Sequence, residues 1–441
     1  MNIKRTMLAI AGALIAASCL AAKDDVAARD LIECNPRKGL PNFFAKAERG
    51  SDIKVGYLGG SITAQHGWRV RSLDLFRKLY PKSNFSEVNA AIGGTGSSFG
   101  VMRVQKDIIE SKPDLVFVEF AVNDHGGGKE YIEKNMEGIV RQIWTDNPNA
   151  DICFVYTVVE RDIDVMKDGK MKRTSSIMEG LADHYGIPSI DFGKAVVDLV
   201  KAGKLVMKTD NKPMSAVAGD SLNTTAAIGS DGKIPFAKDG VHPHTNTGHV
   251  IYTEAIERSI PAMRKASGAP APHVLGPKMS PNAPDKISAV RTVELDSLKD
   301  FPRDEKDKSA WSQYLRLEPG DEITLKFRGT EAAACVRLGT DSGYMEFSVD
   351  GGKFRKVRNF DPYCGWNRRS MTTFCSGLKD GVHTVVIRAL GDKFDKKAIL
   401  FKQHHADFEK NPQKFAPTRT YISAFFINGD FISAEKTATA K

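Results

Sequence analysis

Short apolar runs alternate with helical patterns from about residue 53 to residue 260, and this alternation is the strongest constraint on the fold. The apolar runs predict strands at 53–58, 84–92, 115–120, 152–159 and 188–191. Apolar residues at helical spacing predict helices at 68–80, 102–109, 131–144, 175–185 and 246–256. The run 115–120 is almost continuously apolar, as expected for a strand that is covered on both faces. Strands that alternate with helices are joined by right-handed crossovers, so the sequence predicts an α/β domain with a parallel sheet.

A different pattern begins after residue 266. Five prolines lie in the segment 267–284, which has few apolar residues and is predicted to be a linker or a strap along the surface. Beyond it, apolar and polar residues alternate in several runs that are separated by turn sequences. Since 441 residues are too many for one ordinary core, we expect two domains. The first is predicted over 23–266, an antiparallel β-sandwich over 285–433, and a loose tail over 434–441.

The N-terminus has the features of an export signal. Lys4 and Arg5 precede the apolar stretch 7–17, which small residues follow, and we predict a signal peptide over 1–22. The apolar stretch is too short for a permanent membrane-spanning helix, and no later stretch is long and apolar enough to be one. Cys19 lies in a sequence that resembles a bacterial lipoprotein box, so lipidation at Cys19 stays open as an alternative to ordinary cleavage. The protein is therefore expected to be exported, either periplasmic or secreted.

Charge and cysteine spacing exclude some functions. The formal net charge is +9, but the basic residues are spread among acidic ones and no basic run is interleaved with aromatic residues, so nucleic-acid binding is not expected. None of the six cysteines forms a Cys-x-x-Cys pair, so a cysteine-based zinc site is not expected either. Cys364 and Cys375 flank a turn-rich segment and are the first choice for a disulfide, whereas Cys153 is expected to be buried in a strand. Nothing in the pattern indicates an oligomeric state.

Ser61 follows two glycines at the end of the first predicted strand, in the sequence Gly59-Gly60-Ser61-Ile62. A serine at this position projects from the carboxyl edge of a parallel sheet, where the sites of open α/β folds form. Its hydroxyl is a poor nucleophile unless a neighbouring base activates it. The alternative interpretation is a tight turn in which Ser61 only caps the following helix.

Two further segments follow predicted strands and end at the same edge of the sheet. The first is 89–97, whose glycines permit a backbone N–H to point at a ligand oxygen. Its glycine spacing is not that of a dinucleotide-binding motif. The second contains Asn123, whose amide is able to donate a hydrogen bond to a developing oxyanion. A flexible loop and an Asx-turn that ends the strand are the respective alternatives.

A carboxylate lies three residues before a histidine in Asp239-Gly240-Val241-His242. Histidine acts as a base when an acceptor holds its far nitrogen, and a carboxylate in a tight turn is able to do this. His244 and His249 follow closely and raise the alternative of a zinc site, but no acidic or cysteine ligand is indicated nearby, so no metal is expected. Secondary candidates, expected to be exposed or to lie behind the site, are His66, Asp124 and His125.

In chain order, these four segments resemble the four sequence blocks of the SGNH (GDSL-like) hydrolase family over roughly residues 52–260. The resemblance implies a flavodoxin-like three-layer fold with a parallel sheet, a catalytic triad and no cofactor. It assigns the triad to Ser61, Asp239 and His242. It assigns the oxyanion hole to the backbone N–H groups of Ser61 and Gly94 and to the side chain of Asn123.

Two details of the resemblance depend on single residues. Gly94 is chosen over Gly93 because it lies five residues after Asn89, as in the family block. The usual Gly-Asp-Ser-Leu reads Gly-Gly-Ser-Ile here, with Gly60 in place of the aspartate. This departure removes no triad residue and occurs in carbohydrate-acting branches of the family.

The resemblance, together with export and a β-sandwich, implies a serine esterase that removes O-acetyl groups from a carbohydrate. Trp311, Tyr363 and Trp366 are candidates for stacking on sugar rings, although aromatic residues in a sandwich are more often part of the core. No long apolar lid segment suited to a fatty acyl chain is present. Alternatives are a lysophospholipase or thioesterase with the same triad, a glycan O-acyltransferase and a non-catalytic glycan-binding protein. The expected partner is an acetylated glycan or another small ester.

Overall fold

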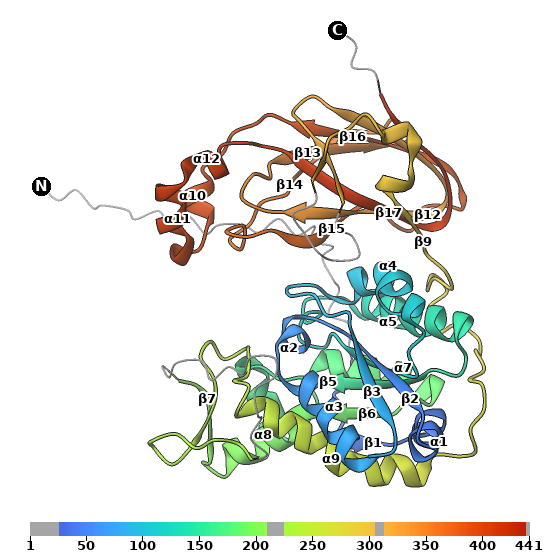
Figure 1. The fold of residues 1–441 in the computed structure, drawn as a ribbon, viewed down its shortest axis with the longest axis vertical. Coiled ribbons are helices and arrows are strands. Elements are labelled where there is room, and N and C mark those ends of the chain that lie inside the picture. Colours follow the sequence, from blue (N-terminus) through green and yellow to red (C-terminus); the bar gives the residue numbers. More distant parts are fainter. Residues whose placement is uncertain (1–25, 210–224, 305–312, 438–441) are drawn as a thin grey trace, which may run out of the picture.

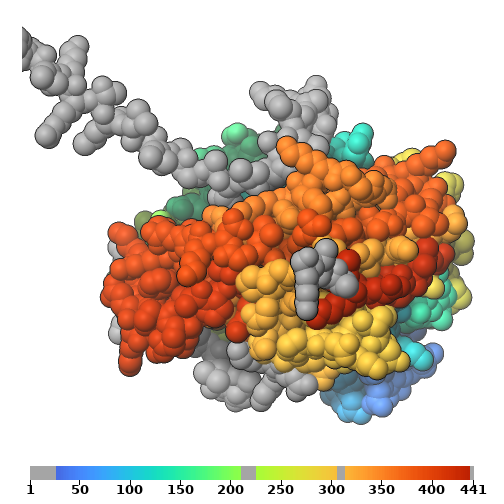
Figure 2. All heavy atoms as spheres, turned by 90° about the horizontal axis from the view of Figure 1, so that it is seen from above, coloured from blue at the N-terminus to red at the C-terminus, as the bar shows by residue number. Residues whose placement is uncertain are grey.

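The computed structural model describes residues 26–209, 225–304 and 313–437, which form an α/β domain and a β-sandwich (Figure 1). The predicted signal peptide, Cys19 and Trp311 lie outside the described residues. Seen from above, the sandwich covers most of the α/β domain (Figure 2). Every helix in the described part of the chain is too short or too polar to cross a membrane.

The α/β domain is built on a six-stranded sheet with the order β1-β6-β5-β4-β2-β3. The strands are β1 (Cys34–Asn35), β2 (Asp52–Gly59), β3 (Asn84–Asn89), β4 (Leu115–Glu119), β5 (Asp151–Tyr156) and β6 (Ser189–Asp191). Strands β2 to β6 are parallel, which confirms the predicted α/β fold. The edge strand β1 is antiparallel, and the sequence does not predict it because two residues are too few to form an alternating pattern.

Helices cover both faces of this sheet (Figure 1). One face carries α4 (Ser97–Asp107), α5 (Lys129–Asp146) and α7 (Arg173–Tyr185). The other carries α1 (Pro41–Glu48), α3 (Trp68–Leu79), α8 (Phe192–Lys201) and α9 (Gly248–Ala266). Shorter elements are α2 (Ser61–Ala64), α6 (Ile163–Lys167) and the parallel pair β7 (Leu205–Lys208) and β8 (Ile234–Ala237). The strands and helices predicted from the sequence do not include this pair.

Aromatic side chains fill the core beneath the ends of β2 and β4. Tyr57 stacks on Phe117 with ring centroids 5.6 Å apart, and Trp68 meets Phe117 edge-on at 5.7 Å. All three side chains are buried, and each burial stabilises the fold by roughly 2–3 kcal/mol. The two strands are therefore held rigidly at the edge where Ser61 and Asn123 follow them.

The named strands of the second domain pair in antiparallel fashion. Its strands are β9 (Ser288–Arg291), β10 (Arg303–Asp304), β11 (Tyr314–Leu317), β12 (Glu322–Leu338), β13 (Tyr344–Val349), β14 (Arg355–Arg358), β15 (Arg368–Cys375), β16 (Gly381–Leu390) and β17 (Thr420–Lys436). Three short helices, α10 (Lys396–Ile399), α11 (His405–Lys410) and α12 (Pro412–Phe415), lie between β16 and β17. This arrangement confirms the predicted β-sandwich.

The long strand β12 joins the two layers of the sandwich. Its first part pairs with β16 up to Gly329, and its second part pairs with β15 from Ala332 onward. Gly329 faces Gly429 of β17, and both have positive φ angles, of 147° and 141°. A Cβ atom on either glycine would lie within 2.2 Å of backbone oxygen, so only glycine fits where the paired strands bend from one layer to the other.

Two details of the second domain differ from the sequence prediction. Cys364 and Cys375 are both free, so the expected disulfide between them is wrong. Strand β17 continues to Lys436 and buries Ala434, so the loose tail predicted for 434–441 is wrong at its first residues. Cys153 is buried in β5, as predicted.

The proline-rich segment between the domains forms a strap along α5. His273 stacks on Trp144 with ring centroids 4.4 Å apart, and its Nε2 lies 2.7 Å from Asp151 Oδ1. Farther along, Arg141 Nε of α5 lies 2.5 Å from Asp285 Oδ1. The strap is thus fixed to the α/β domain at both ends.

Candidate active site

Ser61 is the first residue of α2, and only Gly60 separates it from the end of β2. The turn between them needs glycine because side chains approach it closely. A Cβ atom on Gly60 would lie 2.0 Å from Asn123 Oδ1, and one on Gly59 would lie 2.7 Å from the Thr63 hydroxyl. Since Ser61 opens a helix, its backbone N–H has no acceptor within that helix.

The structure brings Ser61, His242 and Asp239 into one hydrogen-bonded chain. Ser61 Oγ lies 2.8 Å from His242 Nε2, although 181 positions separate the two residues. On the far side of the ring, His242 Nδ1 lies 2.7 Å from Asp239 Oδ2. The side chains of His242 and Asp239 are 39% and 52% exposed, so the chain opens to solvent. This is the geometry in which a carboxylate orients an imidazole toward a hydroxyl.

The turn that carries His242 is anchored from three sides. Asp239 Oδ1 accepts hydrogen bonds from the backbone N–H groups of Val241 and His242, at 2.9 and 2.8 Å. The carbonyl of Gly240, which has a φ angle of 74°, accepts a bond of 2.8 Å from the Glu160 N–H. Burial alone would raise the pKa of Asp239, but the hydrogen bonds from His242 and Val241 outweigh it and lower that pKa. Asp239 is therefore ionised at neutral pH.

A hydrogen-bonded chain ties this turn to the residue that follows α2. His249 Nδ1 accepts a bond of 3.1 Å from the Trp68 N–H, so the proton of the neutral ring is on Nε2, which lies 3.3 Å from Gln65 Oε1. Gln65 Nε2 then donates to the carbonyl of Pro243 at 3.2 Å. Burial lowers the pKa of His249 to about 3, so the ring stays neutral. The sequence does not predict this role, because the residues involved come from two segments, 65–68 and 243–249, that lie far apart in the chain.

The two other predicted oxyanion donors lie beside Ser61. A Cβ atom on Gly93 would be 3.6 Å from Ser61 Cβ, which places the 89–97 loop against the serine. Gly94 has a φ angle of 71°, and no atom lies within 4 Å of where its Cβ would be, so it borders open space. Asn123 packs against Gly60 through its amide. The three donor residues named by the sequence thus converge on one edge of the sheet.

Two buried carboxylates support these loops. Glu119, the last residue of β4, accepts bonds from the hydroxyls of Thr63 at 2.9 Å and Thr157 at 2.8 Å, and burial raises its pKa. Asp124 Oδ1 accepts the Ser97 N–H at 3.0 Å and so joins the turn after β4 to the start of α4. The sequence missed Glu119, which reads as the polar end of an apolar strand.

The remaining histidines do not join the triad. His66 is half-buried and His125 is exposed, and neither hydrogen-bonds to the triad within the described ranges. His249 is the second histidine of the considered zinc site, and protein groups contact both of its ring nitrogens. Among the described residues, no three His, Cys, Asp or Glu side chains gather as a metal would require.

Replacing Asp124 with asparagine should make stability less sensitive to pH. Burial, followed by the charge of nearby Glu119, raises the pKa of Asp124 to about 6 from 3.8. As the pH rises from 4 to 6, the unfolded chain loses this proton first, so the native state loses up to about 3 kcal/mol of stability that it does not regain at higher pH. Asp124→Asn keeps an acceptor for the Ser97 N–H and removes this loss.

Urea unfolding of both proteins at pH 4 and pH 8 checks this expectation. From pH 4 to pH 8, the free energy of unfolding of Asp124→Asn should increase relative to that of wild type. Asp231→Asn, at an exposed aspartate, serves as the control and should show no such change. An unchanged difference for Asp124→Asn would contradict the assignment of a buried, high-pKa carboxyl.

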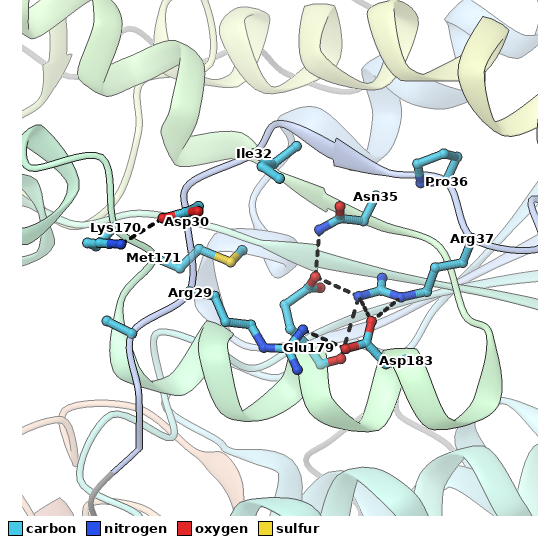
Figure 3. A pocket seen from close by; sticks show the side chains of 11 residues that line it. Arg29, Asp30, Ile32, Asn35, Pro36, Arg37, Lys170, Met171, Glu179 and Asp183 are labelled. Atoms are coloured by element: carbon cyan, nitrogen blue, oxygen red, sulfur yellow. Dashed lines mark hydrogen bonds and ion pairs between the residues drawn. The ribbon is translucent and has the colours of Figure 1, made fainter.

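A hollow of about 500 Å³ lies elsewhere, between the 28–37 segment and α7 (Figure 3). Buried Glu179 accepts hydrogen bonds of 2.6 Å from both Arg37 and Asn35, and Arg29 pairs with Asp183 at 2.6 Å. The charges around the hollow thus neutralise one another, and none of the predicted site residues lines it. These contacts attach the 28–37 segment to α7, and the hollow is not part of the site at Ser61.

Comparison with known proteins matches residues 57–246 to the model of the GDSL-like Lipase/Acylhydrolase family. No curated protein sequence matches the chain. Among solved structures, the chain is similar to a two-domain esterase (CEX) active on acetylated mannans, with a TM-score of 0.66 and 19% identity over 91% of this chain and 98% of that one. The same esterase co-crystallized with mannopentaose gives a TM-score of 0.63, with 19% identity over 92% and 97% of the two chains. At this identity, the likeness establishes a common two-domain fold.

Proposed function

Because residues 57–246 form a domain of the GDSL-like lipase/acylhydrolase family, we propose that this protein is a serine esterase that removes O-acetyl groups from a carbohydrate. The observation that carries the proposal is the chain of contacts from Asp239 through His242 to Ser61, at 2.7 and 2.8 Å. Hydroxyl, imidazole and carboxylate in this order are the elements of acyl transfer through a serine.

The reaction has two halves. His242 Nε2 takes the proton of the Ser61 hydroxyl while Ser61 Oγ attacks the carbonyl carbon of the ester. The carbonyl oxygen becomes an oxyanion, which the N–H groups of Ser61 and Gly94 and the amide of Asn123 hold. His242 then gives its proton to the departing sugar oxygen, and the acetyl group stays on Ser61.

Water completes the cycle. His242 takes a proton from water as that water attacks the acetyl-serine, and a second oxyanion forms in the same place. Its collapse returns the proton to Ser61 Oγ and releases acetate. Asp239 stays ionised throughout and stabilises the imidazolium that forms twice per turnover, in keeping with its lowered pKa.

An exposed aromatic cluster on the sandwich supports a sugar as the substrate. Tyr363 is 49% and Trp366 47% exposed, and their rings lie 6.3 Å apart, centroid to centroid. Phe401, also exposed, extends the cluster with its ring 4.8 Å from that of Tyr363. Large aromatic faces left in water mark binding surfaces, and flat rings with polar tips suit the apolar faces of sugars. The two-domain fold shared with an esterase active on acetylated mannans points the same way.

The acyl group and the polymer are tested together. We expect acetate release from at least one acetylated polysaccharide in a panel that includes mannan and xylan, and faster cleavage of p-nitrophenyl acetate than of p-nitrophenyl octanoate. A preference for octanoate would favour the lysophospholipase or thioesterase alternative. Acetylated sugar formed when a free glycan is added would instead identify an acyltransferase.

The contribution of the aromatic cluster to polymer binding is tested with one variant and one control variant. Trp366→Ala should lower the ratio of polymer to p-nitrophenyl acetate activity by about tenfold, since stacking contributes roughly 1–2 kcal/mol. Val382→Ala, at an exposed apolar residue of β16, should leave the ratio unchanged. We also propose, from the predicted signal peptide, that the reaction takes place outside the cytoplasm, where glycan polymers are found.

A further inference from the structure

Helix α4 is shared by the two domains and leads directly out of the loop that carries Gly94. On its sandwich side, Phe99 meets Phe426 of β17 edge-on, with ring centroids 6.1 Å apart. On its other side, Gly100 lies so close to the residue that follows β4 that a Cβ atom there would be 2.7 Å from the Phe120 ring. Any shift of the sandwich is therefore transmitted to α4, because packed side chains of this kind do not slide freely.

A row of charged side chains continues this contact to the loop. Arg369 of β15 reaches across the domain boundary, with Nη1 3.5 Å from Asp107 Oδ1. The other oxygen of Asp107 accepts a hydrogen bond of 2.8 Å from Arg103 Nη1. The same Nη1 of Arg103 donates to the carbonyl of Ala90, at the base of the 89–97 loop. Sandwich and loop are thus joined by two arginines and one aspartate.

The three side chains of this row are largely shielded from solvent. The side chains of Arg103, Asp107 and Arg369 are 0%, 6% and 13% exposed. Among the described residues, Arg103 Nε and Nη2 have no hydrogen-bond partner, so Nη1 makes the hydrogen bonds of a guanidinium that also lies 5.4 Å from the centre of the Phe99 ring. A buried charge held by few contacts shifts when one of them is lost. The Ala90 carbonyl, four residues before Gly94, would shift with it.

We propose that the sandwich positions the oxyanion hole, with Arg369 acting through Asp107 and Arg103 as the positioning residue for the loop that carries the Gly94 N–H. The inference rests on the proposed esterase function and adds a second role for the sandwich beside the binding of substrate. Arg369 is nearly buried at the domain boundary, so we expect its loss to affect the alignment of a donor rather than binding. A misplaced donor costs less than the hundredfold or more that follows the loss of one.

The test compares two ion pairs that cross the same domain boundary. Arg369→Gln breaks the row, whereas Lys134→Gln breaks the contact of 2.5 Å between Lys134 of α5 and Glu331 of β12, which does not touch the loop. With p-nitrophenyl acetate, Arg369→Gln should lower kcat about tenfold with KM within twofold of wild type. Lys134→Gln should keep kcat within twofold, even where its thermal unfolding midpoint falls as far as that of Arg369→Gln.

Inhibition by a boronic acid distinguishes the positioning role from a merely structural role, which would leave the inhibition constant unchanged. Its tetrahedral adduct with Ser61 places an oxygen where the oxyanion forms, so Arg369→Gln should weaken inhibition by the same factor as kcat. Arg369→Lys, which keeps a cation beside Asp107, should recover kcat to within threefold of wild type.

Equal kcat values for Arg369→Gln and Lys134→Gln, or a kcat for Arg369→Lys as low as that for Arg369→Gln, would overturn the inference while leaving the esterase proposal intact. Wild-type protein without Ser61-dependent hydrolysis would overturn both.

Discussion

Ser61→Ala is expected to lower kcat for ester hydrolysis by about 10⁴-fold or more, with the fold unchanged. Ser61 Oγ is the only atom of the chain that forms the acyl-enzyme in the proposed reaction, and His242 Nε2 is already within 2.8 Å of it. The remaining rate would come from the oxyanion donors and from substrate binding alone. Acetate release from an acetylated glycan and hydrolysis of p-nitrophenyl acetate should fall together.

The matched control is Ser86→Ala, which removes an exposed hydroxyl from β3 of the same sheet and should leave kcat unchanged. Thermal unfolding of all three proteins separates a chemical defect from a folding defect. If Ser61→Ala kept more than a tenth of the wild-type activity while the protein was free of contaminating esterase, acyl transfer through Ser61 would be excluded.

Asp239→Asn is expected to lower kcat by about 10³- to 10⁴-fold, with a small effect on KM. Asparagine fills the same space but carries no charge, so it does not stabilise the imidazolium of His242. Its amide group is also able to donate a hydrogen bond to His242 Nδ1, which would place the ring proton on Nε2 and remove the base that faces Ser61. Both effects act on the chemical step rather than on binding.

A double variant distinguishes this account from a loss of folding. Because triad residues act as a unit, Ser61→Ala combined with Asp239→Asn should be no slower than Ser61→Ala alone. Asp231→Asn, an exposed aspartate whose carboxylate likewise accepts a nearby backbone N–H, should keep full activity. Independent, multiplying losses in the double variant would show that Asp239 does not act through His242.

Local pattern was enough to predict the architecture, whereas the site residues were assigned through the resemblance to the SGNH (GDSL-like) hydrolase family. Buried parallel strands are read as apolar runs, and Ser61 and Asn123 stand out because each ends such a run. Since the carboxyl ends of parallel strands meet at one edge, residues far apart in the chain are expected to be neighbours without any knowledge of the loops. His242, from the last loop of the domain, fits the same reasoning.

The sequence did not predict features that depend on contacts between distant segments of the chain. Glu119 is explained only by hydroxyls on two other segments, and Gln65 only by His249 and Pro243. The helix α8 was missed because it begins directly after β6, with no turn residues between strand and helix. The expected disulfide failed for a related reason, since nearness in sequence does not fix the direction of the Cβ atoms that a disulfide must join.

The apolar cluster of the α/β domain does not stop at the strap. It includes Ala333 and Cys335 of β12 and Ala424 and Phe426 of β17, which belong to the other half of the chain. Separation of the two domains would therefore expose two complementary apolar faces and leave each domain prone to aggregate. To exchange the sandwich for another module, both faces of this interface would have to be redesigned, because residues of the sandwich are part of the core of the α/β domain.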